Sequence, residues 1–167
     1  MSKASNKVRW CLDQASRQIA SGSKHRGLVK IEPDPERARE FVEKAEHNLE
    51  VFLLNKKHGY YDWAINIGFY VTYHCCLAII TKFGYETRNQ DCTLALIEYL
   101  VEEGKIEPDF RRYLDAIAPA GNDEGAVLPM REKYQYTPII DIDKQKVEEL
   151  LTICQDMIKD TKGIIQG

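Results

Sequence analysis

Several chemical signatures are missing from this sequence of 167 residues. It contains no glycine-rich phosphate loop, no HExxH zinc motif and no GxSxG nucleophile elbow, which argues against the enzyme classes that these motifs define. Its five cysteines form no CxxC pair and have no metal-ligand spacing, so we predict no metal site and no cofactor. Any function must therefore come from ordinary polar and aromatic side chains brought together by the fold.

The cysteines also bear on the cellular compartment. They are odd in number, no secretory signal precedes them, and Cys75 and Cys76 are adjacent inside an apolar run. Reduced thiols are typical of cytoplasmic proteins, where free cysteine behaves as a small core residue. We therefore predict reduced thiols, most of them buried, in a cytoplasmic protein.

A long, strongly hydrophobic run is also lacking. Residues 60–81 carry a single formal charge, Asp62, but Asn66, Thr72, His74 and several tyrosines interrupt the apolar residues. A membrane-spanning helix needs about 20 predominantly apolar residues. This segment is therefore predicted to be the central buried helix of a bundle, and no membrane association is expected.

Charge is distributed unevenly. Residues 1–33 contain seven Lys and Arg against two acidic residues, a net charge of +5, whereas the rest of the chain has 16 basic and 24 acidic residues, a net charge of −8. A basic arm next to an acidic body favours docking on that body, on a second copy or on a polyanion. The alternative is a solvated basic helix without a partner.

The periodicity of apolar residues predicts helices and no strands. A basic amphipathic helix is expected at about 4–20, followed by a linker, so residues 1–33 form one unit. Asp34-Pro35 is a helix start, because Asp caps exposed amides and Pro suits the first helical position. Residues 34–167 are predicted to be an all-α, up-and-down bundle of about five helices with a flexible loop at 119–129. The predicted bundle helices lie near 35–58, 60–83, 90–103, 108–118 and 143–164.

A family resemblance accompanies this order of elements. The segments 38–49, 58–64 and 68–80, followed by Gly84, resemble the HEPN (higher eukaryotes and prokaryotes nucleotide-binding) superfamily. The resemblance covers roughly 35–164 and leaves the basic N-terminal helix outside. It implies a helical domain that binds a nucleotide or RNA and commonly pairs with a second copy. We therefore predict a homodimer.

The resemblance also implies a possible catalytic site. Catalytic HEPN ribonucleases carry an Arg-x4-His motif, paired across a dimer, which cleaves RNA without a metal. In this chain the corresponding residues are Arg131 and Tyr136, so the motif is Arg-x4-Tyr. A phenol with a pKa of about 10 cannot simply replace an imidazole with a pKa of about 6.5 as a proton shuttle, whereas the arginine can still bind phosphate. The pair favours binding without efficient cleavage.

Three readings of the function follow. The first is a non-catalytic nucleotide- or RNA-binding module; family members of this kind often accompany a small nucleotidyltransferase in antitoxin or resistance systems, and here that partner would be a separate protein. The second is a metal-independent HEPN ribonuclease or toxin in which tyrosine substitutes for histidine. The third is a structural homodimer without a ligand.

Five residues are candidates for the ligand site, each with a structural alternative. Arg131 is an anion ligand or half of a salt bridge, and Tyr136 is a site residue or packs beneath the last helix. His74 and Tyr70, one turn apart, and Asn48 are site residues or satisfied members of the core. A helical backbone from 131 to 136 would place the two side chains about 140° apart.

Aromatic residues are concentrated between positions 60 and 73. At helical spacing they indicate core packing or a dimer interface more often than a platform for base stacking. Trp63, together with Asp62, is expected to cap and anchor the central helix.

Overall fold

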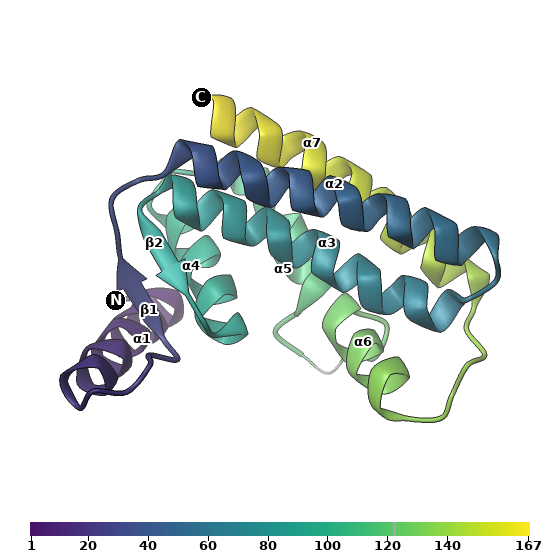
Figure 1. Ribbon diagram of the computed structural model, residues 1–167, viewed down its shortest axis with the longest axis horizontal. Helices are drawn as coiled ribbons and strands as arrows, with labels where there is room; N and C mark the ends of the chain where they lie inside the picture. Colours follow the sequence, from purple (N-terminus) through teal and green to yellow (C-terminus); the bar gives the residue numbers. More distant parts are fainter. Residues whose placement is uncertain (122) are drawn as a thin grey trace.

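The computed structural model describes residues 1–121 and 123–167, so one position of the predicted 119–129 loop lies outside the described residues. Within these ranges the chain is mainly helical, which confirms the all-α prediction (Figure 1). The elements in chain order are α1 (Lys3–Ala20), β1 (Leu28–Lys30), α2 (Pro35–Lys57), α3 (Tyr61–Lys82), β2 (Tyr85–Thr87), α4 (Gln90–Glu102), the 3₁₀ helix η1 (Pro108–Phe110), α5 (Arg111–Ile117), α6 (Val127–Tyr136) and α7 (Lys144–Gln166).

Three long helices form the body of the bundle. α2, α3 and α7 run side by side along the long axis of the molecule, and α3 packs against both of the others (Figure 1). Phe52, Ile65, Phe69 and Leu150 fill the space between them and are at most 2% exposed. By length and composition α3 could cross a membrane, but 72% of its most apolar window is buried, as expected for a central bundle helix.

The prediction that the chain has no strands is wrong at two short segments. β1 pairs with β2 in an antiparallel ladder in which Leu28 lies opposite Thr87 and Lys30 opposite Tyr85. Each strand has only three residues, too few for an alternating pattern to be visible in the sequence. The pairing ties the expected linker to the segment that follows α3.

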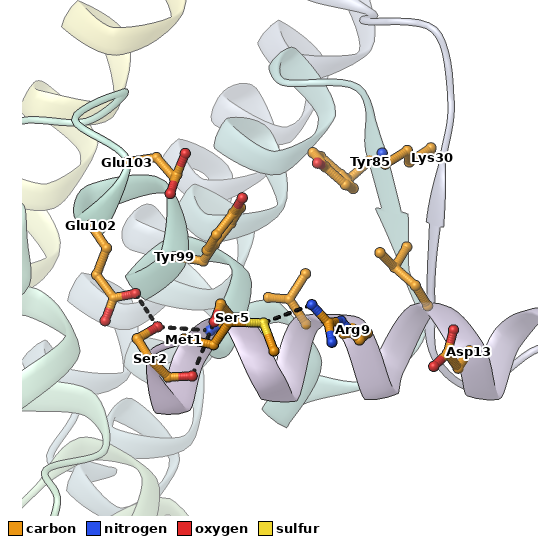
Figure 2. A pocket seen from close by; sticks show the side chains of 12 residues that line it. Met1, Ser2, Ser5, Arg9, Asp13, Lys30, Tyr85, Tyr99, Glu102 and Glu103 are labelled. Atoms are coloured by element: carbon orange, nitrogen blue, oxygen red, sulfur yellow. Dashed lines mark hydrogen bonds between the residues drawn. The ribbon is translucent and has the colours of Figure 1, made fainter.

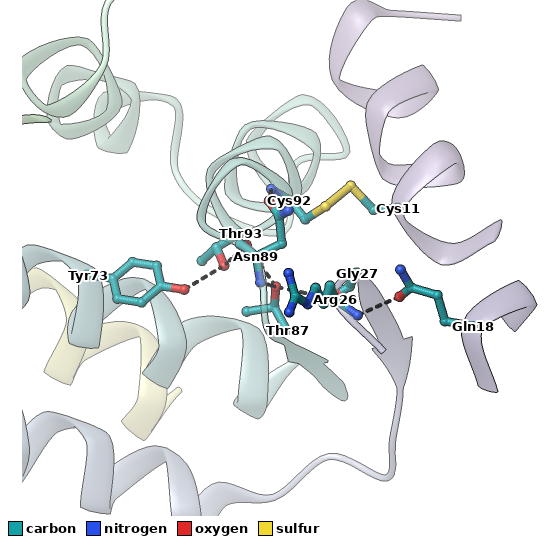
Figure 3. Close-up of a disulfide and its surroundings, with 9 residues drawn as sticks. All are labelled: Cys11, Gln18, Arg26, Gly27, Tyr73, Thr87, Asn89, Cys92 and Thr93. Atoms are coloured by element: carbon teal, nitrogen blue, oxygen red, sulfur yellow. Dashed lines mark hydrogen bonds between the residues drawn. A yellow bond between two sulfur atoms is a disulfide. The ribbon is translucent and has the colours of Figure 1, made fainter. Parts of the chain in front are cut away.

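The prediction of reduced thiols is wrong for two of the five cysteines. Cys11 in α1 and Cys92 in α4 form a disulfide across 81 positions of sequence (Figure 3). Spacing along the chain carries no sign of this bridge, because α1 reaches α4 only in the folded molecule. The other three cysteines are free and buried, as predicted, and burial raises the pKa of the Cys75 thiol to about 12.

The basic arm docks on the body of its own chain. α1 contacts α4 and β1, and the residues that it buries are Ala4, Val8, Cys11 and Ala15. Trp10 is 47% exposed, and Ile19 is 54% exposed. The contact therefore depends on small side chains and the disulfide.

Opposite charges meet where the arm lies on the bundle. Figure 2 shows a hollow of about 500 Å³ between α1, α4 and the hairpin, lined on one side by Arg9 and Lys30 and on another by Glu102 and Glu103. The Ser2 hydroxyl, at the start of α1, donates a hydrogen bond to Glu102. Charged groups of the arm and of the body thus lie around one hollow, but among the described residues no Lys or Arg of the arm forms an ion pair with an acidic residue of the body.

The predicted loop at 119–129 ends early, because α6 begins at Val127. Pro129 is compatible with this start, since it occupies the third helical position, where the backbone N–H has no partner within the helix. α6 is continuous from Val127 to Tyr136, so Arg131 and Tyr136 lie on one helix. The bundle accordingly contains one helix more than predicted.

Candidate functional site

A groove of about 340 Å³ lies where α3 meets α2 and the end of α6. α2 contributes Lys44 and Asn48, and α6 contributes Gln135. The remaining lining residues come from α3 at positions 63, 66, 67, 70 and 74, a spacing that places them on one face of the helix. The groove therefore combines an aromatic and apolar surface with a few amide, imidazole and ammonium groups.

His74 and Asn48 meet at one end of the groove. His74 Nδ1 lies 2.7 Å from the Tyr70 carbonyl oxygen, which can only accept, so Nδ1 carries the proton. The Asn48 amide is 3.3 Å from the same nitrogen, and turning the amide by 180° lets Asn48 Oδ1 share that proton. Nε2 of the neutral ring is then an acceptor.

The environment of His74 keeps its imidazole neutral. Burial lowers its pKa, and the positive charge of Lys44 lowers it further, against the opposing effect of the hydrogen bond with the Tyr70 carbonyl. At neutral pH the ring is therefore an uncharged hydrogen-bonding group. It adds no positive charge to the groove, where Lys44 supplies the cation.

Arg131 packs on the aromatic residues beside the groove. Its guanidinium carbon lies 4.5 Å from the Phe69 ring centre and 5.4 Å from that of Tyr70, within the range of cation–π contacts. Nη2 donates to the Tyr70 hydroxyl at 3.3 Å, and Nε is buried without a partner. Among the described residues no carboxylate forms an ion pair with Arg131, so the alternative of an internal salt bridge is not realised.

Tyr136 lies apart from this arrangement. Because α6 is helical throughout, its side chain projects about 140° around the helix from Arg131. It is 72% exposed and does not pack beneath α7, so the structural alternative considered for it is also wrong. Of the five predicted site residues, the structure brings Asn48, Tyr70, His74 and Arg131 together and leaves Tyr136 outside.

Two lining residues were missed by the sequence reasoning. Trp63 was expected to anchor α3 but is 57% exposed and forms part of the groove. Asn66 is only 4% exposed, and its Oδ1 has no hydrogen-bond partner among the described residues. The sequence did contain a pattern that could have identified them. Trp63, Asn66, Tyr70 and His74 are spaced by three and four residues, which places them on one face of a helix.

The groove presents cationic, amide, imidazole and aromatic groups that can contact a ligand. Within residues 1–121 and 123–167, no group of three or more histidine, cysteine or acidic side chains is placed to hold a metal ion. The imidazole of His74 is held by Tyr70 and Asn48, and no carboxylate of the described residues forms an ion pair with it. Arg131 and Lys44 supply positive charge, and the aromatic rings supply flat apolar surface.

Comparison with known proteins identifies the domain. The family model for the HEPN domain matches residues 38–164, from the first turn of α2 almost to the end of α7. The chain belongs to the HEPN family. A search of the curated proteins finds no match. The resemblance noted in the sequence is therefore confirmed over the predicted range.

All residues of the groove lie inside the HEPN domain, whereas α1 and β1 precede the matched region. The HEPN domains are generally related to nucleotides or RNA, and this chain shares that general assignment. Its Arg-x4-Tyr sequence occupies consecutive turns of α6, with only the arginine directed to the aromatic residues beside the groove. The disulfide joins α1 to the HEPN domain at the start of α4.

Proposed function

We propose that this HEPN domain binds a nucleotide or RNA through the groove between α2, α3 and α6, and that Arg131 is its principal phosphate ligand. The observation that carries the proposal is the position of Arg131: aromatic rings hold it beside the groove, and no carboxylate neutralises it among the described residues. A guanidinium has five N–H donors, and its contact with Tyr70 occupies one of them. Nε is buried, and the remaining Nη donors can form charge-assisted hydrogen bonds with an anion.

Replacing Arg131 by alanine is expected to weaken binding of single-stranded RNA by at least about 1 kcal/mol, roughly fivefold, because a charged hydrogen bond is lost. Fluorescence anisotropy with a labelled oligonucleotide measures the effect. Lys133→Ala is the matched control, since Lys133 has the same charge and lies on the same helix but packs over the Tyr134 ring, whereas Arg131 packs on Phe69 and Tyr70. An equal loss in both variants would indicate general charge attraction and contradict the proposed role of Arg131.

The competing function is metal-independent RNA cleavage, and Tyr136→His tests it by restoring the Arg-x4-His pattern. Because Tyr136 projects away from Arg131 on a continuous helix, we expect neither the wild type nor this variant to cleave labelled RNA in the presence of EDTA. Cleavage that appears in the histidine variant and disappears when Arg131 is also replaced would establish the ribonuclease function instead.

We also infer that the protein forms a homodimer. Large apolar side chains are exposed at the end of the molecule where α2 turns into α3 and α6 leads into α7, which favours a protein–protein interface there. They are Leu53, Leu54, Tyr60, Tyr136, Ile139 and Ile140.

Light scattering at micromolar concentration is expected to give twice the chain mass of 19.3 kDa. The double variant Leu54→Glu and Ile140→Glu should be monomeric, because it places charges in the apolar surface. Trp10→Glu is the control, since Trp10 is also exposed but lies on α1, at the other end of the molecule. A wild-type protein with the mass of a single chain would contradict the proposed homodimer.

The biological setting is part of the same proposal. A small, separately encoded nucleotidyltransferase in a toxin–antitoxin or resistance system is the partner that the family suggests. Co-purification of a nucleotidyltransferase with the chain in its native cell would support this setting. If no nucleotidyltransferase co-purifies, this setting is contradicted, but the proposed binding function of the groove is not affected.

A further inference from the structure

We propose that one side of α1 is a second surface for single-stranded RNA, on which three cations bind phosphates and a tryptophan stacks with a base. This surface, which we call the basic stripe, consists of Lys3, Lys7, Trp10 and Arg17. It goes beyond the proposed function of the groove, because α1 precedes the HEPN domain and lies at the other end of the molecule from α6 (Figure 1).

The basic stripe occupies one side of its helix. At 3.6 residues per turn, its four residues fall within an arc of about 80° around the helix axis. The side chains that α1 buries against the body fall within a different arc of about 60°, and they are Ala4, Val8, Cys11 and Ala15. Because the Cys11–Cys92 disulfide joins the buried side to α4, that side stays turned to the body and the stripe stays beside it, toward solvent.

The charges of the stripe are not neutralised by the rest of the molecule. Lys3 and Arg17 are exposed, and Lys7 is half-buried. Residues 1–33 carry a net charge of +5, yet none of their seven Lys and Arg forms an ion pair with a carboxylate among the described residues. Asp13, the single acidic residue of α1, lines the hollow on another side of the helix. Unpaired cations along one side of a helix favour a polyanion as the partner.

Trp10 places an aromatic ring among these cations. Its side chain is 47% exposed, and Lys7 Nζ lies 4.3 Å from the centre of its ring. Proteins that bind single-stranded nucleic acids combine cations along the backbone with aromatic rings on which bases stack. The bases of a duplex are already stacked within the helix and do not reach such a ring. The stripe therefore fits a single strand.

The loop that follows α1 adds to the positive charge at one end of the stripe. The Arg26 amide donates a hydrogen bond to Gln18 Oε1 at 2.6 Å, which holds the loop next to the last turn of α1. Arg26 and Lys24 are both exposed in this loop. From Lys3 to Arg17 the stripe is about 21 Å long, at 1.5 Å per residue, which is enough for several successive phosphates.

The docking of α1 distinguishes RNA from an anionic membrane as the partner. A basic amphipathic helix binds a membrane by burying its apolar face in the bilayer. In this chain the apolar face of α1 packs on α4 and β1, and the disulfide joins it there. Cations and one indole are what remains accessible, and the general assignment of the HEPN domain to nucleotides or RNA agrees with a nucleic acid partner.

The dependence of RNA binding on salt tests the cations of the stripe. A plot of log K against log salt for a labelled single-stranded RNA of about 16 nucleotides, a length at the upper end of such binding sites, gives a slope that reports the number of phosphates bound. In the triple variant Lys3→Gln, Lys7→Gln and Arg17→Gln we expect this slope to decrease in magnitude by about 2, because each phosphate contact with a single strand contributes about 0.7.

The triple variant Arg39→Gln, Lys57→Gln and Lys159→Gln is the matched control. It removes the same residue types from exposed positions on α2 and α7 that form no ion pair among the described residues. We expect its slope to equal that of the wild type. Equal decreases in the two variants, or a wild-type slope in the stripe variant, would overturn the proposal.

Trp10 is tested by affinity at constant salt. We expect Trp10→Ala to weaken RNA binding at least about fivefold without changing the slope, and Trp10→Phe to retain most of the affinity, because a phenyl ring still stacks. Equal affinities of the alanine variant and the wild type would overturn the stacking role. Failure of the groove looks different, because then Arg131→Ala has no effect while the stripe variants still do.

Vesicles of phosphatidylserine and phosphatidylcholine in equal parts test the other polyanion. We expect the oxidised wild type not to bind them. If it binds the vesicles and the stripe variant does not, while both bind RNA equally, the partner of the stripe is a membrane and the assignment to RNA is overturned.

Discussion

Removing the Cys11–Cys92 bridge, by replacing both cysteines with alanine, is expected to release α1 from α4 and to increase tryptic cleavage within α1 on the order of 100-fold. α1 holds to the body through few and small side chains, of which Val8 is the largest buried residue. A disulfide that closes a loop of this length stabilises the closed form by about 4.5 kcal/mol when only chain entropy is counted. Without it, the apolar contact that remains is too small to keep α1 docked for most of the time.

Limited proteolysis measures this release, because Lys7, Arg9 and Arg17 are tryptic sites on α1. The wild type in the presence of a dithiol reductant should behave like the double variant, and the double variant should not respond to the reductant. If the rate of cleavage within α1 is the same in all four samples, the packing of α1 does not depend on the bridge.

Replacing Gly68 by valine is expected to lower the free energy of unfolding by about 3 kcal/mol, because no space exists for a side chain at this position. A Cβ atom on Gly68 would lie 2.5 Å from Leu150 Cδ2, 2.9 Å from Leu150 Cγ and 3.1 Å from Phe52 Cε2. Leu150 and Phe52 are themselves buried in the core, so neither can move aside without displacing its neighbours. α3 and α7 would have to separate.

Chemical denaturation measures the loss, and Gly163→Val is the matched control. Gly163 is also within a helix, α7, but a Cβ there would meet nothing within 4 Å, so its replacement should change stability by less than about 0.5 kcal/mol. Similar effects at the two positions would show that the close contact of α3 with α7 is not what requires glycine at 68. The close packing at Gly68 also bears on the groove, because it determines how near α3, which carries most of the groove residues, lies to α2 and α7.

The candidate site was only partly predictable from the sequence. Asn48, Tyr70, His74 and Arg131 were identified because polar residues within apolar helices, and an arginine in a recognisable motif position, stand out locally. Tyr136 was included through the same motif, and the continuity of α6 then turned it away. Trp63 and Asn66 were given other roles or none, because burial and hydrogen bonding depend on neighbours from α2 and α6 that the sequence does not place.

The sequence by itself determined the helices other than α6 and approximately where they begin and end, because these features depend on interactions within a few residues. Asp34 Oδ1 accepts from the Arg37 amide at 2.9 Å as the predicted cap, and Gly84, at φ +83°, follows the end of α3 in a conformation that favours glycine. Tertiary structure alone decided the β1–β2 pairing, the Cys11–Cys92 bridge and the groove. Each of these joins segments that are distant in sequence, and no local pattern of polarity or spacing specifies which distant surfaces meet.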